Sequence, residues 1–161
     1  MSTPAPAAES IFDPQQTIMQ TEPVAAPSPV FQGQPKVLII DDSVTVRSLL
    51  SMTFENAGYE VEQARDGQDA LKQLQEGLNP HLVFCDIEMP RMDGLKLLSY
   101  LQADPVLSQI PVAMLTSRGA KKHRQIAAER GAKGYFTKPY VEDVLLDAAK
   151  RLIAGEMLLE V

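Results

Sequence analysis

Cysteine and histidine are scarce in this chain of 161 residues: Cys85 is the only cysteine, and there are two histidines. A single cysteine excludes an intramolecular disulfide, and two histidines cannot complete a Cys/His zinc cluster. This composition fits a reducing, cytosolic setting. Cys85 ends an apolar run, so we expect it to act as a small buried apolar group rather than as a redox sensor.

Positive charge and long hydrophobic runs are also limited. The formal net charge is −6 and the isoelectric point is near 4.9, which argues against a general affinity for nucleic acid or anionic membranes. No run reaches the roughly 20 apolar residues of a membrane span. Residues 1–35 contain no Lys or Arg with which a signal peptide could begin. These absences predict a soluble, cytoplasmic protein without direct membrane contact.

Composition divides the chain into three parts. Residues 1–35 hold seven of the twelve prolines and are predicted to be a disordered tail or linker. Within them, the small apolar island Ser10–Met19 either docks on a partner or, as we prefer, is plain linker. Residues 36–154 are predicted to form one domain, and residues 155–161 a short C-terminal tail.

From Lys36 onward, short apolar runs alternate with stretches of helical period. Strands are predicted at Lys36–Ile40, Tyr59–Gln63, Leu82–Cys85, Pro111–Leu115 and Gly134–Phe136. Helices are predicted at Val44–Ala57, Gly67–Glu76, Leu95–Leu101, Ala120–Arg130 and Val141–Ile153. Apolar strands that each precede a helix indicate an α/β fold with a parallel sheet covered on both faces. Ligands bind such sheets at the carboxyl ends of the strands.

Polar residues gather at those strand ends: Asp41, Asp42, Asp86, Thr116 and Lys138. Three carboxylates at one edge would repel one another unless a cation is present, and Mg²⁺ accepts carboxylates, waters and phosphate oxygens. A carboxylate such as Asp86 could then attack a phosphoryl group. Lys138 and the Thr116 hydroxyl could stabilise the transferred oxygens.

Each of these residues alone also has a simpler interpretation. Asp42 or Ser43 could be only the N-cap of the first helix, and Asp93, before Gly94, could serve the turn. Thr116 could be a strand end with a locally satisfied hydroxyl, and Lys138 could be solvated. The residues alone leave these alternatives open, whereas the ordered set is far more specific.

The set resembles the receiver domain of two-component response regulators. The resemblance is carried by Ile40-Asp41-Asp42-Ser43, by Asp86 to Pro90 with Asp93-Gly94, by Leu115-Thr116-Ser117 and by Lys138-Pro139, and it covers about residues 36–154. It implies a flavodoxin-like, doubly wound fold of five strand-helix units with strand order 2-1-3-4-5.

The resemblance also implies roles. Asp86 would be the phosphoacceptor, and Asp42 and Asp86 would bind Mg²⁺ with Asp41, directly or through water, and with the backbone carbonyl of Glu88. Thr116 and Lys138 would bind the phosphoryl group. Tyr135 would be the switch aromatic, for which a half-buried sheet-edge tyrosine is the simpler alternative. The Lys138-Pro139 peptide bond would be cis.

Two further expectations concern lifetime and output. Glu88 and Arg118 each lie two residues after a site residue and are expected to border the path of the hydrolytic water. The face made by the fourth helix, fifth strand and fifth helix would bind a downstream protein. The fourth helix contains Lys121, Lys122, Arg124 and Arg130, which could select an acidic partner, although a solvated helix surface is the preferred interpretation.

The predicted function is that of a signalling module, not an enzyme, phosphorylated by a histidine kinase or a histidine phosphotransfer domain and present as a monomer or weak dimer. The amino-acid sequence most resembles receivers at the carboxyl end of chemotaxis-kinase-like hybrid histidine kinases, or single-domain motility regulators of cyanobacteria. Alternatives are a binding-only pseudo-receiver and a haloacid-dehalogenase-type phosphatase, whose Asp-x-Asp pattern Asp41–Ser43 does not match.

Overall fold

A computed structural model describes residues 33–117 and 119–159. The predicted tail at residues 1–35, with the island Ser10–Met19, therefore lies almost wholly outside the described residues. The remainder contains the predicted domain, and its elements are described below.

The described residues form a five-stranded parallel sheet with the order β2-β1-β3-β4-β5. The strands are β1 (Lys36–Ile40), β2 (Glu60–Ala64), β3 (Leu82–Cys85), β4 (Val112–Thr116) and β5 (Gly134–Thr137). The helices are α1 (Val44–Asn56), α2 (Gly67–Gln75), α3 (Gly94–Gln102), α4 (Lys121–Glu129) and α5 (Glu142–Ile153), with the short 3₁₀ helix η2 (Leu107–Gln109) before β4. The predicted fold class and strand order are confirmed.

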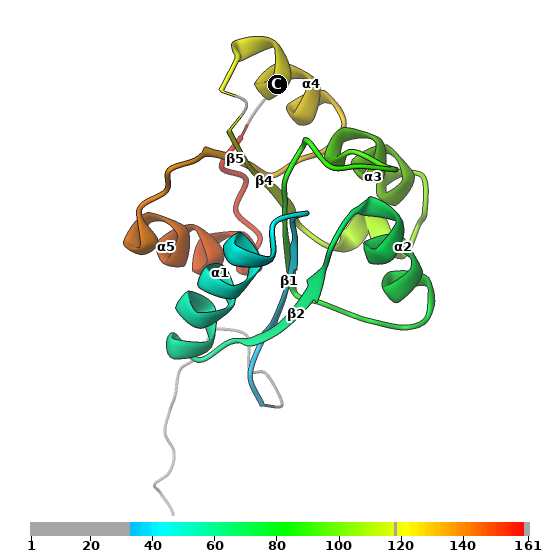
Figure 1. Cartoon of the computed structure of the whole chain (residues 1–161). Coiled ribbons are helices and arrows are strands. Elements are labelled where there is room, and N and C mark those ends of the chain that lie inside the picture. The colour runs from blue at the N-terminus through cyan, green and yellow to red at the C-terminus, as the bar shows by residue number, and fades with distance from the viewer. Residues whose placement is uncertain (1–32, 118, 160–161) are drawn as a thin grey trace, which may run out of the picture. The chain divides into compact units, whose positions relative to one another are not determined.

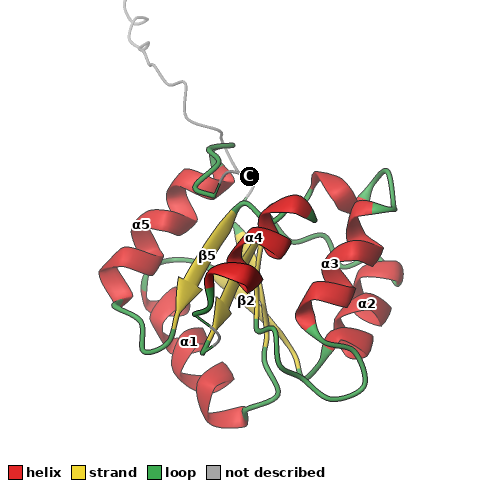
Figure 2. Cartoon of the chain, turned by 90° about the horizontal axis from the view of Figure 1, so that it is seen from above, coloured by secondary structure: helices red, strands yellow, loops and turns green. Residues whose placement is uncertain are grey.

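Helices cover both faces of the sheet (Figures 1 and 2). Helices α1 and α5 lie on one face, and α2, α3 and α4 lie on the other. Successive strand residues point to opposite faces, so Leu38 and Ile40 pack with α2 and α3 while Val37 and Ile39 pack with α1 and α5. All residues of β3 and β4 are buried, which explains why these strands read as continuous apolar runs.

Side-chain caps begin the first three helices. Ser43 accepts a hydrogen bond from the Val46 N–H, Asp66 from the Asp69 N–H, and Asp93 from the Lys96 N–H. Each bond satisfies a backbone donor that the first helical turn leaves free. The caps fix where each chain segment turns from a strand end into the following helix, and so they shape the loops at that edge of the sheet.

Element boundaries differ from the sequence prediction by at most one residue at either end. Strand β2 begins at Glu60, and Tyr59 before it instead packs edge-on against Phe54, with ring centroids 5.5 Å apart. Helix η2 was not predicted. At its start, Asp104 Oδ1 accepts hydrogen bonds from the Val106 and Leu107 N–H groups, at 2.8 and 3.0 Å. A turn stabilised by a side chain in this way leaves no periodic pattern of apolar residues from which it could be predicted.

The segment after α5 packs on the domain. The Leu158 N–H donates to the Lys133 carbonyl at 2.8 Å, and Leu159 is 5% exposed. Leu159 belongs to the core cluster on the α2–α3–α4 side of the sheet. Within the described residues, no helix has both the length and the apolar character needed to cross a membrane.

Candidate functional site

The candidate site lies at the carboxyl edge of the sheet. Strands β1 and β3 are neighbours, and their last residues, Ile40 and Cys85, are paired in register. The residues that follow them, Asp41 and Asp86, are therefore brought side by side. Because β4 and β5 lie next in the sheet, Thr116 and the segment leading to Lys138 reach the same edge.

Three carboxylates form a compact cluster there. One carboxylate oxygen from each of Asp41, Asp42 and Asp86 lies within 4.8 Å of the others. Asp41 and Asp86 are only 3% and 7% exposed, whereas Asp42 is exposed to solvent. Two buried carboxylates and one accessible carboxylate, all oxygen donors, match what a hard divalent cation such as Mg²⁺ requires. The residues present therefore fit the ion that the sequence predicted.

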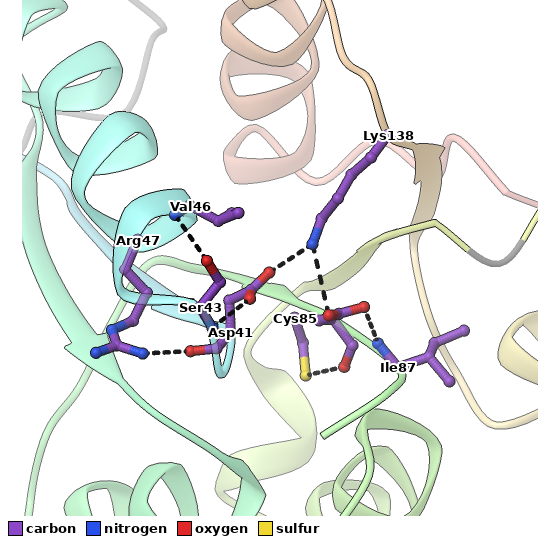
Figure 3. Close-up of polar contacts among 8 residues, drawn as sticks. Asp41, Ser43, Val46, Arg47, Cys85, Ile87 and Lys138 are labelled. Atoms are coloured by element: carbon purple, nitrogen blue, oxygen red, sulfur yellow. Dashed lines mark hydrogen bonds and ion pairs between the residues drawn. The ribbon is translucent and has the colours of Figure 1, made fainter. Parts of the chain in front are cut away.

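Lys138 provides positive charge to the cluster (Figure 3). Its Nζ atom lies 2.6 Å from Asp41 Oδ2 and 3.5 Å from Asp86 Oδ2. Burial lowers the pKa of this amine, but the two carboxylates outweigh burial, so that its pKa is raised overall. Lys138 is thus held as a cation and is not simply solvated. The Lys138–Pro139 peptide bond is cis.

The carboxylate of Asp86 is oriented by its own backbone. Its Oδ1 atom accepts a hydrogen bond from the Ile87 N–H at 2.7 Å, which leaves Oδ2 on the Lys138 side. Burial raises the pKa of Asp86, and Asp41 adds to that rise, while Lys138 and hydrogen bonds from Thr116 and the Ile87 N–H oppose it. The net direction is upward, as expected for a buried carboxylate beside another.

Gly94 packs closely against the backbone of Asp86. A Cβ atom at Gly94 would lie 2.0 Å from the Asp86 carbonyl oxygen. Only glycine therefore fits at the start of α3, where the loop returns to the strand end. Asp93, directly before it, caps α3, which extends the turn role expected for this residue.

Thr116 and Tyr135 are both buried. Thr116 ends β4 and is fully buried. Tyr135 lies on the edge strand β5, as the simpler alternative expected, but it is only 6% exposed and therefore not half-buried. The guanidinium carbon of Arg124, from α4, lies 5.7 Å from the centroid of the Tyr135 ring, within the range of a cation–π contact.

Different residues cap α1 and complete the carboxylate cluster. Ser43 caps α1 with its hydroxyl, so Asp42 is not needed as the cap and contributes to the carboxylate cluster. Asp42 and Glu88 line a cavity of about 500 Å³ with residues of the β3–α3 loop and His123 of α4. This cavity lies beside Asp42, the solvent-exposed member of the carboxylate cluster.

Sequence reasoning missed Arg47. Its guanidinium donates a hydrogen bond from an η nitrogen to the Asp41 carbonyl at 2.6 Å and from Nε to Gln63 Oε1 at 3.2 Å. The available signal was its position four residues after the Ser43 cap, which places the side chain one turn into α1, back over the strand end. Arg47 thereby fixes the backbone that carries two of the three carboxylates.

Two remaining predicted residues have different outcomes. Arg118 lies outside the described residues, so its pairing with Glu88 stays a prediction. Cys85 is 1% exposed, its thiol donates to the Asp86 carbonyl at 3.1 Å, and burial together with nearby carboxylates raises its pKa well above the ordinary value.

Comparisons with known proteins identify relatives of this site and fold. The sequence profile of the response regulator receiver domain matches residues 37–150. The chain is 35% identical over 119 residues to the DNA-binding dual master transcriptional regulator RpaA of a Synechocystis strain, covering 74% of this chain and 49% of that protein, so it spans about half the length of that relative. It is 34% identical over 111 residues to the chemotaxis protein CheY1 of Helicobacter pylori, covering 68% of this chain and 90% of that protein.

The structural comparison gives the same result. The solved structure of the chemotaxis protein CheY4 of Vibrio cholerae superposes with a TM-score of 0.69 at 33% identity, covering 74% of this chain and 98% of that one. Since the profile match spans most of the chain and the carboxylate cluster lies at the expected edge of the sheet, the chain belongs to the response regulator receiver domain family, a family of two-component signalling modules.

Proposed function

We propose that the protein is a phosphoacceptor module of a two-component or phosphorelay pathway, in which Asp86 receives a phosphoryl group from a histidine kinase or a histidine phosphotransfer domain. One observation carries the proposal: the carboxylates of Asp41, Asp42 and Asp86 converge within 4.8 Å while Lys138 contacts two of them. A buried carboxylate beside a cation and a cation-binding cluster suits phosphoryl transfer.

In the transfer step, an Asp86 oxygen forms a bond to phosphorus as the bond from phosphorus to the donor's imidazole nitrogen breaks, giving an acyl phosphate. The Ile87 N–H keeps the carboxylate oriented. The Lys138 ammonium and the Thr116 hydroxyl bind the transferred oxygens at the strand edge. The protein catalyses only this transfer and the later loss of its own phosphoryl group.

The carboxylates of Asp41, Asp42 and Asp86, with the Glu88 carbonyl, would hold Mg²⁺. When bound, the ion neutralises the carboxylates and the charge of the incoming phosphoryl group. The buried position of Asp41 and the exposed position of Asp42 let the cluster anchor a cation without closing the site to a donor.

Output is proposed to pass through the face formed by α4, β5 and α5. The phosphoryl group adds roughly −1.5 to −2 of charge at neutral pH and draws the Thr116 hydroxyl toward it. Tyr135 lies on β5 under Arg124 of α4, so a change in its side-chain position alters this face. We propose a downstream protein as the target, in motility or taxis signalling in the cytoplasm.

The decisive test is intact-protein mass spectrometry after incubation with acetyl phosphate and Mg²⁺. We expect the mass of one phosphoryl group to be added to the wild-type chain and not to the Asp86→Asn variant, and to be lost when EDTA replaces Mg²⁺. Asp93→Asn is the matched control, because it changes an exposed aspartate of the same loop and asparagine preserves the α3 cap. A wild-type chain that gains no mass would favour the binding-only alternative.

A further inference from the structure

Arg91 has an unusual backbone conformation in the loop that follows Asp86. Its φ angle is 67°, the only positive value for a non-glycine residue among the described residues. L side chains rarely adopt this left-handed conformation, and here the backbone closes a three-residue turn across Arg91, because the Met92 N–H donates to the Pro90 carbonyl at 2.7 Å. One contact of the Arg91 side chain adds to this turn in holding Arg91 in place.

That contact is an ion pair with Asp66, at the start of α2. The Nε atom of Arg91 lies 2.7 Å from Asp66 Oδ2, and an η nitrogen lies 2.5 Å from the same oxygen. Asp66 is 1% exposed, while its other oxygen, Oδ1, caps α2 by accepting from the Asp69 N–H at 2.8 Å. One buried carboxylate thus joins the start of α2 to the loop of the phosphoacceptor.

The charge of Asp66 is retained in this buried position. Burial by itself raises the pKa of Asp66, but the Asp69 N–H and the Arg91 guanidinium outweigh it, so that the pKa is lowered. The pair is therefore ionic, and a charged hydrogen bond of this kind is stronger and more directional than a neutral one.

A second contact brings the same two segments together. A Cβ atom at Gly67, the first residue of α2, would lie 2.7 Å from the Met92 carbonyl oxygen. Met92 is itself buried in the core, and its N–H donates to the Pro90 carbonyl at 2.7 Å. The end of the β3–α3 loop, at Met92, is therefore packed on α2. Arg91 connects this packed end to the earlier part of the loop, which contains Glu88.

We infer that the Arg91–Asp66 ion pair is a positioning device for the phosphoacceptor loop: it holds Arg91 in its left-handed conformation and so directs the preceding residues, including the Glu88 carbonyl, toward the carboxylate cluster. The inference rests on the proposed function, since it assigns the pair an effect on cation binding. Arg91 is a positioning residue, because neither it nor Asp66 belongs to the cluster.

Without the pair, Arg91 relaxes toward ordinary backbone angles, and the binding-competent loop becomes only one of several conformations. The apparent affinity for a ligand falls in proportion to the population of the competent state. We therefore expect Mg²⁺ to bind roughly tenfold more weakly when the pair is broken.

The test measures Mg²⁺ binding to the full chain by isothermal titration calorimetry. Asp66→Asn removes the charge but preserves the α2 cap, and Arg91→Ala removes the guanidinium. Arg91→Lys keeps the charge and should recover part of the affinity. Arg151→Ala is the matched control, because it breaks a pair of the same chemistry with Glu156 that is exposed on both sides. Its Mg²⁺ affinity should equal that of the wild type.

Hydrogen exchange of residues 87–93 in the metal-free protein provides a readout that does not depend on Mg²⁺. We expect faster exchange in Asp66→Asn and Arg91→Ala than in Arg151→Ala, at temperatures where circular dichroism shows all variants folded. If the wild type binds Mg²⁺ and both pair variants bind it equally well, the positioning role is refuted and the proposed function stands. If the wild type binds no Mg²⁺, both are refuted.

Discussion

At the scale of single residues, the site places like charges together. Asp41 and Asp86 are buried side by side, and Lys138 lies closer to Asp41 than to Asp86, at 2.6 against 3.5 Å. Asp86 is therefore the less compensated carboxylate, which agrees with the upward direction of its pKa. Such a group destabilises the folded protein when it is ionised, and this penalty is characteristic of functional sites.

Replacing Asp86 should therefore stabilise the metal-free protein. In EDTA at pH 7.5, we expect Asp86→Asn to raise the midpoint of thermal unfolding by about 3 °C, which corresponds to about 1 kcal/mol in a domain of this size. Lys138 keeps its closer partner, Asp41, in the variant. Adding Mg²⁺ should stabilise the wild type more than the variant. Calorimetry that finds the variant less stable than the wild type in EDTA would contradict this account.

Cys85 should be unreactive in the folded protein. Its burial and its raised pKa both suppress the thiolate that reacts with electrophiles. We expect the native chain to react with Ellman's reagent at least about 100-fold more slowly than the chain unfolded in guanidinium chloride. Rapid modification of the native chain would instead favour the redox-sensor interpretation.

At the scale of elements, the loops at the carboxyl edge depend on the helix starts beside them. Ser43, Asp66 and Asp93 are caps, and Asp66 additionally binds Arg91 of the β3–α3 loop. A cap residue is easily identified in a sequence by its type and position. The sequence does not show which other residue a cap side chain also binds. Asp66 and Arg91 meet only because α2 packs against the β3–α3 loop.

Asp66 should make stability depend on pH in a defined range. Its folded-state pKa is lowered, so the stability that its charge contributes is fully present above the unfolded-state value of about 3.9 and is lost as the pH falls through the folded-state pKa. We expect Asp66→Asn to lower the free energy of unfolding by about 2 kcal/mol at pH 7. In urea titrations, this difference should shrink only below about pH 4. A difference that stays constant down to pH 3 would show that charge is not involved.

At the scale of the whole molecule, residues after α5 complete the core. Leu159 is 5% exposed and joins the cluster on the α2–α3–α4 side, and the Leu158 N–H bonds to the Lys133 carbonyl before β5. The last described residues therefore contribute to the stability of the domain that carries the site, instead of only following it.

Leu159→Ala should destabilise the domain by about 2–3 kcal/mol, since it removes buried methyl groups from a packed position. Urea unfolding followed by circular dichroism measures this loss. Met157→Ala is the matched control, because Met157 is 52% exposed, and it should change stability by less than about 0.5 kcal/mol. Equal effects of the two substitutions would show that the burial of Leu159 does not matter.

The sequence by itself determined the elements and the edge of the sheet where the site lies. Apolar runs and helical periods predict strands and helices because burial imposes those patterns locally. Parallel strands then place Asp41, Asp86 and Thr116 at a single edge. The strand order came from the family resemblance, because local patterns do not encode which strands become neighbours.

Only the tertiary structure decided the contacts between segments distant in the chain. These include the 2.6 Å contact of Lys138 with Asp41, the hydrogen bond of Arg47 to Gln63, the cation–π contact of Arg124 with Tyr135 and the ion pair of Arg91 with Asp66. Each depends on how whole helices and loops pack, and a charged residue type is compatible with many partners until packing selects one.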